Sequence, residues 1–153
     1  MIPKEFFVTS GKALSTVSEL NAFDMALEKA GIGQCNLVPV SSIIPPNCQE
    51  VKWKEISIGA ITFTVMARME GKGGEKIGAG IAWAWEKNKN YGLVMETSGH
   101  ADEKSIKETL EGKLREMAKV REIEITDINY RTEVLRVPPN HYGSVIAALV
   151  YEF

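Results

Sequence analysis

The sequence predicts an α+β fold in which mostly antiparallel sheet is covered on the outside by helices. Segments rich in β-branched and apolar residues outnumber segments with helical periodicity, so strands should dominate. Long helices do not alternate regularly with these strands, as they do around a parallel sheet. The length of 153 residues is that of one domain with a substantial core.

The N-terminal region is expected to contain one short strand and one helix. Residues 5–9 (EFFVT) have the composition of a strand, and residues 11–19 (GKALSTVSE) are expected to form a loop. Asn21 is a candidate N-cap for the helix that follows. The apolar face of this helix consists of Phe23, Leu27 and Ala30, and the glycines at 31 and 33 should end it.

A second strand and a rigid turn are expected next. Residues 35–42 (CNLVPVSS) have strand character, and Pro39 within them favours a sheet edge or a bulge. Residues 43–47 (IIPPN) follow with two prolines and an asparagine, which indicate a fixed, non-helical turn.

Three strands are predicted in the centre of the chain, over residues 56–70, 76–86 and 90–99. The glycines between the first and second indicate a hairpin. Trp83 and Trp85 alternate with alanines, so both should point to one packed or interface face of the sheet.

The clearest helix is predicted from about residue 102 to 120, followed by two strands at 125–137 and 142–153. Acidic residues at its start and basic residues at its end suit the helix dipole. Its apolar face is expected to comprise Ile106, Leu110, Leu114, Met117 and Val120.

Composition limits the function. Net charge is −2 without a Lys/Arg block, so nucleic acid is not an expected partner. No apolar stretch reaches the ~20 residues of a membrane helix, and the start lacks a signal-peptide core, so we expect a cytoplasmic protein without membrane association. Cys35 and Cys48 are expected to be free thiols. The two histidines lack the neighbours of a metal site, so no metal is expected.

Residues 20–46 (LNAFDMALEKAGIGQCNLVPVSSIIPP) carry the most specific signal. Their order and spacing, together with Gly-Leu-Val-Met-Glu at 92–96 and Arg-Glu-Met-Ala at 115–118, resemble the pyruvoyl-dependent arginine decarboxylases over residues 14–153. The resemblance implies a four-layer αββα sandwich. It also implies decarboxylation of L-arginine to agmatine and CO₂, which would feed polyamine synthesis, and a homotrimer of cleaved pairs, with further pairing of trimers left open.

The resemblance places self-cleavage between Ser41 and Ser42, giving chains 1–41 and 42–153. The Ser42 hydroxyl would attack the Ser41 carbonyl, and elimination from the resulting ester would leave a covalent pyruvoyl group at residue 42. Such a ketone acts as an electron sink, as pyridoxal phosphate does elsewhere. The acyl shift is uphill in a relaxed peptide, so strained geometry is expected here, with Pro45 and Pro46 stiffening the turn.

Three further site residues follow from the resemblance. Glu96 would deliver the proton to the former α-carbon, with a pKa raised by an apolar surrounding. Asn36 would stabilise an oxyanion or the substrate carboxylate. An extended strand would hold Asn36 about 20 Å from Ser42, so either the chain bends at Pro39 or Asn36 serves a neighbouring subunit. Asp24 would bind the guanidinium of arginine, although a carboxylate near a helix N-terminus also has a structural use.

Other interpretations of the same residues stay open. The chain could be a pyruvoyl decarboxylase for another amino acid, or an uncleaved paralogue that only assembles with an active enzyme. It could also be a hydrolase that uses Ser42 as an N-terminal nucleophile.

Overall fold

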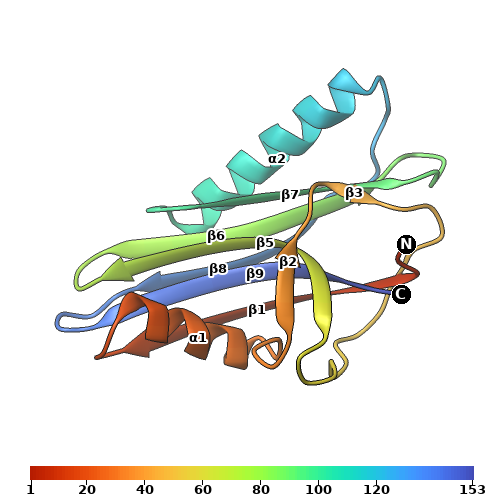
Figure 1. Cartoon of the computed structure of the whole chain (residues 1–153). Helices are drawn as coiled ribbons and strands as arrows, with labels where there is room; N and C mark the ends of the chain where they lie inside the picture. The colour runs from red at the N-terminus through yellow and green to blue at the C-terminus, as the bar shows by residue number, and fades with distance from the viewer.

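The computed structural model describes all 153 residues and shows two β-sheets packed face to face, with one helix on each outer face (Figure 1). This confirms the predicted α+β sandwich. The elements in chain order are β1 (Glu5–Ser15), α1 (Glu19–Lys29), β2 (Asn36–Pro39), β3 (Ile43–Ile44), β4 (Gln49–Glu50), β5 (Ile61–Lys72), β6 (Lys76–Trp85), β7 (Gly92–Gly99), α2 (Glu103–Val120), β8 (Asn129–Arg136) and β9 (Tyr142–Glu152).

The five-stranded sheet, here called sheet A, has the order β2-β5-β9-β1-β4, and the four-stranded sheet B has the order β3-β7-β6-β8. Pairing is antiparallel except between β1 and β4 and between β2 and β5. In Figure 1, α1 lies below sheet A and α2 lies above sheet B. Neither helix is long and apolar enough to cross a membrane.

The core between the sheets is built from the inward faces of both. Its largest cluster includes Phe6 and Leu149 from sheet A and Ile81 and Val94 from sheet B. Both tryptophans of β6 face this cluster, as their alternation predicted. Small residues let α1 pack closely on sheet A, whereas α2 covers sheet B with larger side chains, namely Ile106, Leu110 and Leu114.

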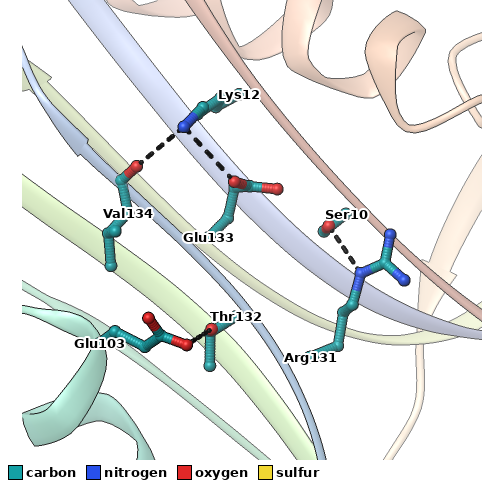
Figure 2. Close-up of polar contacts among 7 residues, drawn as sticks. All are labelled: Ser10, Lys12, Glu103, Arg131, Thr132, Glu133 and Val134. Carbon is teal, nitrogen blue, oxygen red and sulfur yellow. Dashed lines mark hydrogen bonds and ion pairs between the residues drawn. The ribbon is translucent and has the colours of Figure 1, made fainter.

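Polar contacts close one side of the sandwich, where β1 lies beside β8 (Figure 2). Arg131 Nε donates to Ser10 Oγ at 2.8 Å, and Lys12 pairs with Glu133 at 3.8 Å. The helix α2 joins this edge through Glu103, which accepts from Thr132 Oγ1 at 3.4 Å. These groups are largely exposed, so each contact contributes little to stability.

The prediction of a loop after residue 9 was wrong, because β1 continues to Ser15. All eleven residues of β1 pair with β9, so the backbone ladder holds polar residues that have weak strand propensity. Gly11 lies under α1, where a Cβ would collide with the carbonyl oxygen of Ala26. Gly11, within the segment that was predicted as a loop, therefore permits close helix packing.

Both helices differ in detail from the prediction. The N-cap of α1 is Ser18 rather than Asn21, since Ser18 Oγ accepts from the amide of Asn21 at 2.9 Å. In α2 the predicted N-terminal acidic residue Asp102 is the N-cap. The buried face of α2 continues through Ala118 and leaves Val120 80% exposed. Residues four apart share a helix face, so the face that contains Leu110 and Leu114 continues at residue 118 and not at residue 120.

The segment predicted as one strand over 35–42 is divided between the two sheets. Only residues 36–39 form β2, at the edge of sheet A that Pro39 favours. Ile43 and Ile44, predicted to lie in the turn, form β3 in sheet B, and the turn begins at Pro45. The strands predicted from 56 and 125 begin later, at Ile61 and Asn129.

Candidate active site

The chain passes from sheet A to sheet B through residues 40–42, here called the crossing segment. The amide of Val40 donates to the carbonyl of Thr64 in sheet A at 2.9 Å. The carbonyl of Ser42 accepts from the amide of Val94 in sheet B at 2.9 Å. The peptide bond between Ser41 and Ser42 therefore lies between two anchors that belong to different sheets, and Figure 1 shows the chain rising from β2 to β3 there.

Ser42 is half-buried at the end of this segment, whereas Ser41 is exposed. The polar atom paired with Ser42 Oγ is the sulfur of Met95, at 4.0 Å. Since sulfur is a weak acceptor, the hydroxyl is not committed to a strong hydrogen bond. It is therefore available to react with a neighbouring carbonyl.

The backbone of the crossing segment has no left-handed residue. The nearest non-glycine residue with positive φ is Asn47, at 64°, in the turn where Cys48 donates to the carbonyl of Pro45. A non-helical turn follows the crossing segment from Pro45 onward, as predicted. The backbone strain expected at residues 41–42 does not appear as a positive φ. The peptide bond between them is instead distinguished by the hydrogen bonds that hold Val40 to sheet A and Ser42 to sheet B.

Glu96 lies on β7, two residues beyond Val94, about 7 Å along the strand. Because β3 and β7 are antiparallel, the residues that precede Ser42 lie on the side of Val94 where β7 continues to Glu96. β3 pairs only with Gly92 and Leu93, so the strand edge at Glu96 is left open beside the crossing segment. The structure thus brings Glu96 and Ser42 to the same edge of sheet B.

Burial raises the pKa of the Glu96 carboxyl above its ordinary value, and the positive charge of Lys113 partly opposes this rise. The residue as a whole remains exposed at the rim of the core. Lys113 Nζ lies 3.4 Å from the carbonyl oxygen of Glu96 and 3.5 Å from Thr97 Oγ1. A carboxyl in this setting stays protonated to higher pH than a solvated one and can donate its proton.

Asn36 is not brought to Ser42 within one chain. It begins β2, pairs with Ile61, and donates from Nδ2 to the carbonyl of Gly59 at 2.9 Å. The strand stays paired with β5 through Pro39, so the chain does not fold back at that proline. The side chain of Asn36 is exposed.

Asp24 is also separate from Ser42. It lies on α1, on the outer face of sheet A, whereas Ser42 lies where the chain enters sheet B. Its side chain is exposed. Asp24 is six residues beyond the Ser18 N-cap, so it does not have the capping function that a carboxylate in the first turn would have.

One residue of this region was missed by sequence reasoning. Tyr151, 5% exposed, reaches from β9 in sheet A across the core, and its hydroxyl donates to the carbonyl of Ile43 in sheet B at 2.8 Å. The signal was a tyrosine within an otherwise aliphatic strand, since a buried tyrosine hydroxyl requires a partner.

Comparison with known proteins gives a consistent result. The family model described as pyruvoyl-dependent arginine decarboxylase matches residues 5–153. A protein of that name from Methanothermobacter thermautotrophicus is 35% identical over 150 residues, covering 94% of this chain and 93% of the relative. Another from Methanopyrus kandleri is 29% identical over 150 residues, covering 98% and 97%. "Pyruvoyl-dependent arginine decarboxylase 2" of Archaeoglobus fulgidus is 43% identical over 105 residues, covering 65% and 66%.

Proposed function

Because the chain belongs to the pyruvoyl-dependent arginine decarboxylase family, we propose that it cleaves itself between Ser41 and Ser42 and then decarboxylates L-arginine to agmatine and CO₂. The cofactor of this family is a covalently bound pyruvoyl group. The observation that carries the proposal is the crossing segment, where a serine of the required type follows a peptide bond anchored in both sheets.

The cleavage uses atoms of the chain itself. Ser42 Oγ attacks the carbonyl carbon of Ser41, the peptide C–N bond breaks, and the hydroxyl proton passes to the nitrogen of Ser42. Loss of the Ser42 α-proton then breaks the Cβ–Oγ bond, which frees the Ser41 carboxylate and leaves dehydroalanine. Addition of water and loss of ammonia give the ketone. The bond to Val94 keeps the Ser42 carbonyl in place while its neighbour reacts.

The residues around Ser42 fit a small ketone. The side chain is half-buried beside Met95. The conversion would remove the hydroxyl oxygen and exchange the α-nitrogen for one oxygen, so the product is no larger than serine and no larger cavity is required. The pyruvoyl group supplies an electron-withdrawing carbonyl that stabilises the negative charge left when CO₂ departs. Glu96, on the open edge of β7, delivers a proton to the substrate carbon that has lost CO₂.

Asn36 and Asp24 act in this proposal on the Ser42 of a neighbouring copy, in a homotrimer of cleaved pairs. Two observations support assembly at this end of the molecule. One chain alone separates both residues from Ser42, and large apolar side chains nearby are exposed, including Ile43 at 43% and Ile61 at 70%. In this arrangement Asn36 stabilises an oxyanion or the substrate carboxylate, and the Asp24 carboxylate pairs with the guanidinium of arginine. Pairing of trimers and a cytoplasmic location remain predictions.

Denaturing mass spectrometry of the purified protein tests the proposal. We expect one chain of residues 1–41 and one of 42–153, the larger lighter than its encoded sequence by one ammonia, and agmatine formed from arginine. An unchanged mass for 42–153 would instead indicate an N-terminal serine hydrolase. A single intact chain without agmatine would indicate a non-catalytic paralogue, and turnover of lysine or ornithine in place of arginine would indicate another substrate.

A further inference from the structure

Tyr151 joins the two sheets directly beside the proposed cleavage site. Its ring lies in the core cluster between the sheets, and its hydroxyl donates to the carbonyl of Ile43, the residue that follows Ser42. Two successive carbonyls are therefore held from different sheets, that of Ser42 by Val94 in sheet B and that of Ile43 by Tyr151 in sheet A.

This arrangement matters because β3 is a weak element by itself. It has two residues, lies at the edge of sheet B, and pairs with Gly92 and Leu93 alone. While the chain is intact, Val40 adds a further anchor through Thr64. Cleavage between residues 41 and 42 would separate that anchor from β3 and make residue 42 a chain end, and chain ends fray unless they are tied down.

We propose that Tyr151 is a positioning residue, which holds the pyruvoyl-bearing end of the cleaved chain so that residue 42 keeps its place on the edge of β7 that carries Glu96. The inference rests on the proposed function. It explains why an aliphatic strand ends in a tyrosine whose hydroxyl is aimed at a backbone carbonyl of the opposite sheet. Burial raises the pKa of Tyr151, so the hydroxyl remains a donor over the physiological pH range.

Tyr151→Phe tests the proposal, because it removes the hydroxyl and keeps the ring in the core. Thr9→Val is the matched control. Thr9 is also buried, and its hydroxyl donates to a backbone carbonyl, that of Ala30 at 2.7 Å, beneath α1 and away from β3. Both variants lose one buried hydrogen bond of the same kind, so a general loss of stability should affect them alike.

In fully cleaved protein we expect Tyr151→Phe to lower kcat for arginine at least fivefold, with KM changed less than twofold. Hydrogen exchange of residues 43–48 should be faster than in the parent. Thr9→Val should keep the parent's kcat and the parent's exchange in this segment. A Tyr151→Phe protein that is cleaved and retains the parent's kcat would overturn the proposal, as would an equal loss of kcat in both variants.

A second measurement needs no change at Tyr151. Hydrogen exchange of residues 43–48 is compared between the mature parent and uncleaved Ser42→Ala protein. If Tyr151 and Val94 are sufficient anchors, protection of this segment is the same within threefold before and after cleavage, and a larger loss on cleavage refutes the inference. Absence of cleavage and agmatine in the parent would instead refute the proposed function, so the two failures are distinguishable.

Discussion

The carbonyl of Ser42 accepts a 2.9 Å hydrogen bond from the amide of Val94, which fixes residue 42 at the edge of β7. This bond and the one between Val40 and Thr64 lie on opposite sides of a single peptide bond and belong to different sheets. The chemistry proposed for Ser42 and Glu96 depends on this arrangement.

Ser42→Ala should stop cleavage completely, because alanine has no hydroxyl to attack the Ser41 carbonyl and no leaving group on Cβ. Denaturing mass spectrometry should then show one chain of 153 residues. Ser41→Ala is the matched control, since residue 41 contributes only its backbone carbonyl, and it should be cleaved at a rate within tenfold of the parent. Cleavage in Ser42→Ala would exclude the proposed attack.

Glu96→Gln should separate cleavage from turnover. The substitution keeps the shape of the side chain and removes its acidic proton, so we expect intact self-cleavage and a fall in kcat of about 10²–10⁴-fold. Agmatine release by the cleaved variant measures the effect. Parent-like turnover in the variant would show that another group protonates the substrate carbon.

Lys113 should set the pH range through Glu96. Only the protonated carboxyl can donate, so activity should decline as pH rises through its raised pKa. Lys113 lowers that pKa, and Lys113→Met should therefore shift the alkaline limb of the kcat profile to higher pH. Lys107→Met, on the same helix but paired with Glu103 at 3.0 Å, should leave the limb in place. A shift toward lower pH in Lys113→Met would contradict this assignment.

Co-expression tests whether two copies share each site. Asn36→Ala and Ser42→Ala chains should each be inactive alone. In mixed trimers, a site with Ser42 from one chain and Asn36 from its neighbour would be complete, so about a quarter of the parent activity should return with random assembly. The measurement is agmatine formation by the purified mixture. No recovery in a mixture shown to contain both chains would place the whole site within one chain.

The two cysteines should differ in reactivity. Burial raises the pKa of Cys48 to about 11, so its thiol is neutral at pH 8, and the side chain is 2% exposed. Cys35 is only half-buried. A thiol-specific reagent at pH 8 should therefore modify Cys35 first in folded protein and both after denaturation, as read by mass spectrometry. Preferential modification of Cys48 would show that its surroundings open in solution.

Local sequence patterns predicted elements with a repeating apolar face better than elements that are held by distant strand pairing. The i+4 spacing of Ile106, Leu110 and Leu114 identified α2, because burial of one helix face follows directly from that spacing. The second half of β1 was missed, since Gly11 and Lys12 are held in the strand by pairing with β9, which lies more than 130 residues further along the chain. Such tertiary pairing leaves no signal in a short window of sequence.

The site residues also divide into those that local motifs predicted and those that depend on distant contacts. Ser42 and Glu96 were proposed from their surrounding motifs, and the structure places both at one edge of sheet B. Tyr151 was missed because its role depends on a hydrogen bond to Ile43, 108 residues away in the chain. The length of the strand could not predict whether Asn36 and Ser42 approach each other within one chain. Their separation depends on where the chain leaves sheet A.

The position of β1 between β9 and β4 has a consequence for how the molecule is made. Residues 1–41 contain β1, α1 and β2. β1 pairs with β9 along its full length and with β4 at Glu5 and Phe6. A cut after residue 41 would therefore release nothing, and the two pieces would stay together under native conditions although denaturation separates them. Because both pieces contribute strands to sheet A, synthesis as one polypeptide makes the pairing of these strands an intramolecular step. Two separately produced pieces would have to associate before either could form a complete sheet.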